Sequence, residues 1–176
     1  MNYKFKSFRQ NKDGVAAIEF AVIAPLMVTL FFGAVELSDG LLADRKVTVV
    51  ASSIADLISQ DTQIDDAGMA DVFKAAEAVI VPYNVSSLSI RVSSINVETD
   101  GTTDVGWSDG YNTSAYAPGT NFALPTGIGQ PGGSVIVTEV SYDFQSILGQ
   151  LIVGTVVLDD QFFARPRRVL RISRIN

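Results

Sequence analysis

The stretch that decides the fold is VAAIEFAVIAPLMVTLFFGAV, residues 15–35, which holds a single ionisable side chain, Glu19. At about 1.5 Å per residue, a helix of this length spans roughly 31 Å, the thickness of a bilayer hydrocarbon core. The whole chain has a mean hydropathy of +0.27 and 18% charged residues, against about 25% in an average soluble domain. We therefore predict one transmembrane helix over residues 15–37.

The charges on either side of this run predict its orientation. Residues 1–14 carry four basic side chains and one acid, whereas residues 36–164 carry 17 acids and four bases. Because basic flanks stay on the cytoplasmic side of a membrane, the N-terminus is expected inside and the body outside. Two alternatives stay open at this point: a signal peptide cleaved near Ser38–Gly40, and an uncleaved signal anchor.

The composition narrows the possible functions. A chain of 176 residues has room for one compact domain and an appendage. The sequence contains no cysteine and no histidine, which excludes disulfides, thiolate metal sites and His-dependent catalysis. We expect no enzymatic activity, no cofactor and no metal.

Two features of the N-terminal segment do not suit a plain anchor. Glu19 lies inside the apolar run, where a carboxylate costs on the order of 2.5–3.5 kcal/mol without a partner. Gly14 ends the basic leader, and Val15 to Phe20 then read VAAIEF. This order of leader, glycine, small residues, acid and aromatic residue resembles the processing motif of type IV prepilins.

The resemblance implies a set of site residues. A prepilin peptidase of the membrane aspartyl class would cut between Gly14 and Val15, and Glu19 and Phe20 would take part in assembly. The new ammonium group of Val15 in a neighbouring subunit could then compensate the buried carboxylate. Pro25 removes one backbone donor, so we expect a local kink of the membrane helix, either for packing in a filament or as an ordinary membrane-helix proline.

Residues 12–37, which include GVAAIEFAVIAPL, resemble most closely the TadE-like pseudopilins of the tight-adherence (Tad, or Flp) pilus system. The resemblance implies a minor pilin or pseudopilin that assembles or primes an adhesive pilus or secretion filament. It implies an inner-membrane, single-pass protein with a periplasmic body, with entry into the surface pilus left open. The implied partners are the prepilin peptidase, other pilins, the Tad inner-membrane assembly machinery and membrane lipid, with no nucleic acid. The alternative is an uncleaved, signal-anchored extracytoplasmic binding domain.

The remaining chain, residues 38–176, is predicted to be one α+β domain. An apolar stripe at steps of three and four predicts that the helix continues over residues 38–60. Asp65 or Asp66 can cap a second helix that ends near Val79, before Pro82. Period-two patterns then predict about four antiparallel strands, at residues 86–97, 134–144, 152–164 and 168–175. A change of phase after Val92 suggests a bulge near Ser93–Ser94.

The segment from 99 to 133 holds eight of the 14 glycines and reads as a long loop. Its GIGQPG motif, residues 127–132, formally fits a dinucleotide fingerprint, but a turn leading into a strand is the wrong context. The acids of this region fail the EF-hand spacing and are expected to be solvated. Its aromatic residues could be adhesive anchors or could fold back over the sheet; they are Trp107, Tyr111 and Tyr116.

Five arginines lie in the last 12 residues. The acidic body argues against nucleic acid. We expect these arginines to pair with acids of the same domain or of a neighbouring subunit, with anionic headgroups as the alternative.

Overall fold

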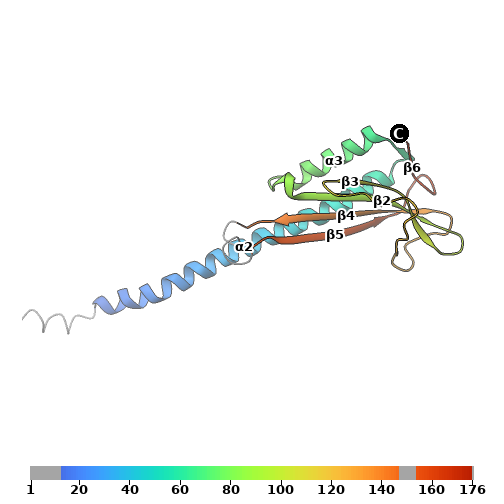
Figure 1. The fold of residues 1–176 in the computed structure, drawn as a ribbon. Helices are drawn as coiled ribbons and strands as arrows, with labels where there is room; N and C mark the ends of the chain where they lie inside the picture. Colours follow the sequence, from blue (N-terminus) through green and yellow to red (C-terminus); the bar gives the residue numbers. More distant parts are fainter. Residues whose placement is uncertain (1–12, 147–153, 176) are drawn as a thin grey trace, which may run out of the picture. The chain divides into compact units, whose positions relative to one another are not determined.

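A computed structural model describes residues 13–146 and 154–175, and the chain divides after Asp39 into two compact units (Figure 1). Two long helices are α2, Asp13–Ser59, and α3, Asp66–Ile80. A short 3-10 helix, η1, covers Val85–Ser87. The strands are β1 Gln63–Ile64, β2 Leu88–Val97, β3 Thr103–Tyr111, β4 Ser134–Phe144, β5 Val156–Ala164 and β6 Ser173–Arg174.

The helix α2 crosses from the first unit into the second without interruption. Gly40 does not interrupt the helix, because a single glycine costs a helix only about 1 kcal/mol. The Ser38 hydroxyl donates to the carbonyl of Ala34 at 2.8 Å, a bond that leaves the helix intact. Within the second unit, Ala43, Val47 and residues at further steps of three and four are fully buried, as the stripe predicted.

The helix α3 begins as predicted from its cap. The carboxylate of Asp65 accepts a hydrogen bond from the backbone N–H of Gly68 at 2.7 Å, which satisfies one of the free donors at the helix start. At the other end, Lys46 of α2 donates to the carbonyls of Val79 and Val81, at 2.8 and 2.6 Å. An ammonium group at the C-terminus of a helix also suits the helix dipole, so Lys46 ties α3 to α2.

The four-stranded antiparallel sheet has the order β3-β2-β4-β5, which confirms the α+β class with two helices and about four strands. The prediction of a loop over 99–133 is wrong at β3, which lies inside it. Residues 103–111 read TDVGWSDGY, with few apolar residues and two glycines. Pairing with Ile90–Val97 of β2 supplies the stability that this local sequence lacks.

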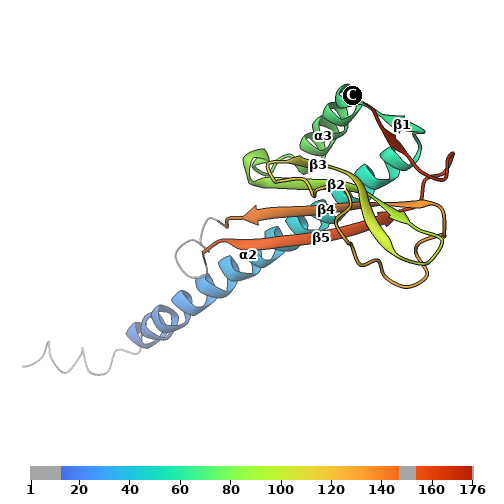
Figure 2. The same cartoon turned by 45° about the vertical axis from the view of Figure 1, so that its right-hand side comes forward.

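The two apolar phases of β2 correspond to two covered faces of the sheet. Helices α2 and α3 cover one face (Figures 1 and 2), and Leu88, Ile90 and Val92 belong to that core. Ile95 and Val97 belong to a second cluster on the other face, under Tyr116, Phe122, Leu124 and Ile128 of the following loop. The expected irregularity is present between Ser94 and Ile95, where Gly106 of β3 has no partner on β2.

The predicted C-terminal strand over 168–175 is much shorter than expected. Only Ser173–Arg174, strand β6, pairs, and it pairs in parallel with β1 rather than joining the main sheet. The predicted strand at 152–164 begins at Val156, and residues 152 and 153 lie outside the described residues. Arginine side chains, rather than strand pairing, hold most of this C-terminal segment, as described below.

One buried hydroxyl gives a direct test of the packing. The hydroxyl of Thr138 in β4 is fully buried and has no hydrogen-bond partner among the described residues. Because an unsatisfied buried hydroxyl costs about 1–3 kcal/mol, Thr138→Val should raise the free energy of unfolding by about 1 kcal/mol, measured by denaturant titration.

The matched control is Thr103→Val. The hydroxyl of Thr103 donates to the carbonyl of Phe122 at 2.6 Å, so the same substitution there should lower the free energy of unfolding by about 1 kcal/mol. Equal effects at the two sites would contradict the assignment of their hydrogen bonds.

Candidate functional site on the N-terminal helix

All five residues selected from the sequence lie on the first part of α2: Gly14, Val15, Glu19, Phe20 and Pro25. The peptide bond between Gly14 and Val15 lies next to Asp13, the first described residue of α2. A Cβ added at Gly14 would meet no atom within 4 Å, and the backbone there does not have a positive φ. Folding of the described chain therefore gives no reason for glycine at this position.

Val15 and Glu19 are four residues apart in α2, so they lie on the same face of the helix, one turn from each other. Glu19 is exposed, and Phe20 beside it keeps 72% of its surface exposed. A carboxylate and a large apolar ring are thus presented together on the outside of the helix. Both groups are available to a neighbouring molecule, and the single chain does not use them for its own packing.

Pro25 lies within α2, and the helix continues on both sides of it. The hydroxyl of Thr29, one turn later, donates to the carbonyl of Pro25 at 2.9 Å. This is an ordinary bond from a threonine to the carbonyl one turn earlier, whereas the carbonyl that loses its regular donor at Pro25 is that of Ala21. The expected kink at Pro25 stays a prediction.

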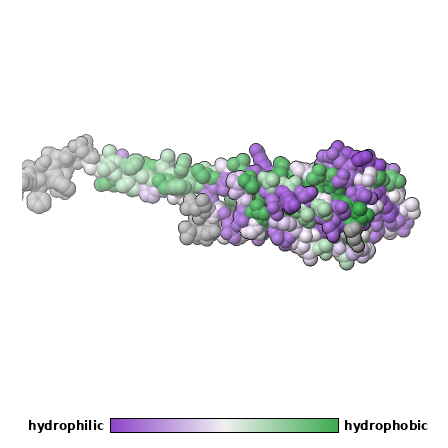
Figure 3. Space-filling view, turned by 90° about the horizontal axis from the view of Figure 1, so that it is seen from above, coloured by the Kyte–Doolittle hydropathy of each residue, from purple (hydrophilic) through white to green (hydrophobic). Residues whose placement is uncertain are grey.

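The helix around these residues is apolar on all sides. It is the one helix among the described residues that is long and apolar enough to cross a membrane, and its most hydrophobic window has no residue buried within the chain. Figure 3 shows this stretch as an almost continuous hydrophobic surface. Large side chains that keep about half or more of their surface exposed include Val15, Ile18, Val22, Leu26, Met27, Leu30, Phe31 and Val35. A stable helix of this kind needs lipid or other helices around it.

The aromatic residues of the 99–133 segment do not form an exposed anchor site. Trp107 is buried and donates from its indole nitrogen to the carbonyl of Ile172 at 2.8 Å. The Tyr111 hydroxyl donates to the Glu77 carboxylate at 2.7 Å, and this hydrogen bond raises the pKa of Tyr111 above its ordinary value. Tyr116 packs against the second apolar cluster, which contains Ile95 and Val97. The alternative that these rings cover the sheet is confirmed.

The acids of the same region each have a separate partner. The Thr102 hydroxyl and backbone N–H donate to Asp100 and lower the pKa of that carboxyl. Glu98 pairs with Arg171 at 3.0 Å. No group of three or more acids close enough to hold a metal is found in residues 13–146 and 154–175.

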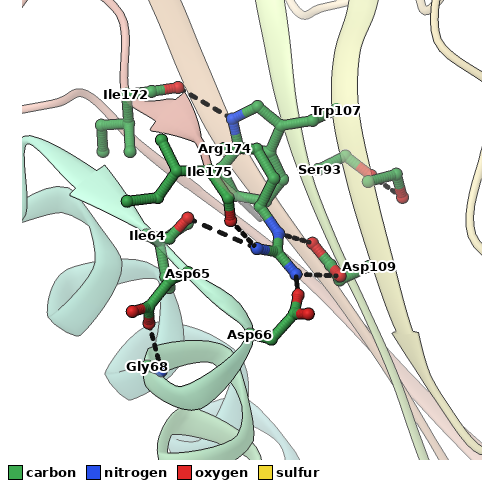
Figure 4. Close-up of polar contacts among 11 residues, drawn as sticks. Ile64, Asp65, Asp66, Gly68, Ser93, Trp107, Asp109, Ile172, Arg174 and Ile175 are labelled. Carbon is green, nitrogen blue, oxygen red and sulfur yellow. Dashed lines mark hydrogen bonds and ion pairs between the residues drawn. The ribbon is translucent and has the colours of Figure 1, made fainter.

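The C-terminal arginines pair largely within their own domain, the first of the two expected arrangements. Arg167 binds Asp56, and Arg165 donates to the carbonyls of Gly127 and Ile128. Arg174 has the most enclosed position: it reaches Asp109 at 2.9 Å, contacts Asp66 at the start of α3, and has only 17% of its side chain exposed (Figure 4). The hydrogen bond to Asp109 raises the pKa of Arg174 further above its ordinary value.

Sequence reasoning did not identify Arg174 as the residue that fastens the C-terminal segment. Its partners lie 65 and 108 residues away in the chain. No local pattern connects positions so far apart. The surplus of arginines near the C-terminus was the only signal available.

Comparisons with known proteins add one finding. The family model of TadE-like proteins matches residues 14–56, a range that begins at Gly14 and ends within α2. The resemblance seen in residues 12–37 is thereby confirmed for the N-terminal helix. No curated protein and no solved structure gives a match.

Arg174 generates a prediction about stability. Arg174→Gln leaves the half-buried Asp109 without its partner, so the free energy of unfolding should fall by about 2–3 kcal/mol. The control is Arg168→Gln, at an exposed arginine of the same segment, which should change it by less than about 0.5 kcal/mol. Similar losses in both variants would show that total charge, and not the Arg174–Asp109 pair, is what matters.

Proposed function

Residues 14–56 match the family model of TadE-like proteins. We propose that the protein is a minor pilin or pseudopilin of a tight-adherence pilus or a related secretion filament. TadE-like proteins are associated with the Tad pilus, and this chain has one helix able to anchor it in a membrane. The proposed role is in assembly or priming and requires no catalytic group and no cofactor.

The observation that carries the proposal is the combination at the start of α2 of an unneeded glycine and an exposed acid. Glycine is a poor helix former, and no described contact demands it at position 14. The order of basic leader, Gly14, small residues and acid supports a peptidase site at this bond. We infer that a prepilin peptidase cuts after Gly14 and removes the basic leader.

Cleavage would change the electrostatics of the site. The mature chain would begin with the ammonium group of Val15, one helical turn from Glu19 and on the same face. In an apolar environment an opposite charge close to a carboxylate offsets much of the cost of burying it. A neighbouring subunit that presents its own Val15 ammonium to Glu19 would therefore fix the axial register between two helices.

The apolar surface of α2 serves the same role in two environments. Before assembly, lipid would cover the exposed side chains from Val15 to Val35, and in a filament other pilin helices would replace the lipid. The basic leader and the acidic body favour a cytoplasmic N-terminus and a periplasmic body in the inner membrane. The proposed partners are the prepilin peptidase, other pilins and the Tad inner-membrane assembly machinery.

The Glu19 carboxylate provides the test. Glu19→Gln removes the charge and keeps the side-chain size, so membrane insertion should be unchanged. Recovery of the partner pilins by crosslinking and affinity isolation should fall by at least about tenfold, because the neighbouring ammonium group would be left unpaired. Pilus formation on the cells should fall with it.

The matched control is Glu36→Gln, at a second glutamate of the first unit, directly after the apolar run. This variant should insert and assemble like the native chain. Normal assembly of the Glu19 variant would favour the plain signal anchor and would contradict the proposal.

A further inference from the structure

The two edges of the main sheet differ in how they are closed. At the β3 edge, the segment 119–122 runs beside the strand and exchanges backbone hydrogen bonds with it. Val105 N–H donates to the carbonyl of Thr120 at 2.9 Å, and Gly119 N–H donates to the carbonyl of Val105 at 2.7 Å. Phe122 N–H donates to the carbonyl of Thr103 at 3.2 Å. The β3 edge is therefore covered over Thr103–Val105.

The opposite edge, β5, is open within the part of the chain that the structure describes. The strand is nine residues long and pairs with β4 over its whole length. No backbone bond from another described segment reaches its outer side. Figures 1 and 2 show β5 as the border of the sheet. At its centre the Gln161 N–H donates to the Asp160 carboxylate at 2.7 Å, a local bond that an added strand would replace. A strand of this length whose outer side bonds no other described segment is a template for one more strand.

The side chains of β5 indicate what kind of strand fits. Apolar residues near both ends are exposed, at 41% for Val156, 54% for Val157 and 40% for Phe162. The centre holds Asp159 and Asp160, whose neighbours on β4 are Ser141 and Val140. No ion pair joins either aspartate to another described residue. The edge is thus apolar at the ends and negatively charged at the centre.

The same charges disfavour pairing between two copies of this strand. In an antiparallel pair of two β5 strands centred on Asp160, the two Asp160 side chains would lie opposite each other. In the neighbouring register, Asp159 of each strand would lie opposite Asp160 of the other. Like charges directly across a strand pair are destabilising, whereas opposite charges are stabilising. The complementary occupant has basic residues at its centre and apolar residues on either side.

Two arginines beyond the end of β5 limit how far the basic part of the occupant can extend. Beyond Ala164, Arg165 and Arg167 border a groove of about 510 Å³ between α2 and the end of β5. These two arginines already bind Gly127, Ile128 and Asp56. A further basic residue would be repelled there, so the groove suits an apolar side chain of the occupant beside Phe162.

We propose that the free edge of β5 is a docking site for an extended protein segment with a basic centre and apolar flanks, which adds a fifth strand to the sheet. Backbone bonds would give the affinity, and Asp159 and Asp160 would give the selectivity. The site is independent of the proposed role of Gly14 and Glu19, and the two can fail separately.

The test uses the full chain in detergent micelles and two synthetic nine-residue peptides. Both have alternating valine and threonine flanks; one has two central lysines and the other two central glutamates. Hydrogen exchange of the β5 amides, residues 156–164, is followed with each peptide. The lysine peptide should slow this exchange, and its affinity should exceed that of the glutamate peptide by at least about tenfold at low salt, with the difference decreasing as salt rises.

Charge variants of the chain test the selectivity. Asp159→Lys combined with Asp160→Lys should reverse the preference between the peptides. The matched control, Asp61→Lys with Asp71→Lys, changes the net charge equally at two exposed positions away from β5, and it should keep the native preference. Exchange in α3 and β2 checks that each variant is folded, and the comparison of peptides on the native chain does not depend on the variants.

Three results would overturn the proposal. The first is that neither peptide slows exchange in β5. The second is that both peptides slow it equally, which removes the role of the aspartates. The third is protection of the β5 amides without peptide that increases with protein concentration, which would mean that a second copy occupies the edge.

Discussion

The structure depends on a helix segment whose exposed apolar side chains are unfavourable in water. From Val15 to Val35, α2 exposes large apolar side chains on all sides, and none of the most hydrophobic stretch is buried by the rest of the chain. At roughly 25 cal/mol for each Å² of apolar surface, such a segment has a strong tendency to enter lipid or to pack against other helices. The single ionisable group within it, Glu19, is costly to bury in lipid without a partner of opposite charge.

The same helix also forms the centre of the folded body. After Gly40 the buried apolar residues of α2 lie on one side of the helix, in a single stripe. That stripe packs with α3 against one face of the sheet. Lys46 and the arginines of the C-terminal segment then join elements that are far apart in the chain. One continuous helix therefore links a segment that needs an apolar environment to a domain with its own core.

The sequence predicted those parts of the fold that depend on local patterns. Four such predictions are confirmed: the long apolar helix, the buried stripe from Ala43, the Asp65 cap and the strands β2 and β4. Strand β3 was missed because its residues have little strand propensity and depend on β2 for their order. The roles of Lys46 and Arg174 were missed because their partners are distant in sequence. At the N-terminal site, the structure places all five predicted residues on one helix, but their proposed roles involve other molecules.

The most direct measurement is the intact mass and N-terminal sequence of three chains extracted from membranes: the native chain, Gly14→Ala and Gly33→Ala. Both glycines lie in α2 with open space around the added Cβ, so both variants should fold equally well. In cells with an active prepilin peptidase, the native chain and Gly33→Ala should begin at Val15, and Gly14→Ala should keep Met1; without the peptidase, all three should keep Met1. A native chain that begins at Met1 in the presence of the peptidase would contradict the account.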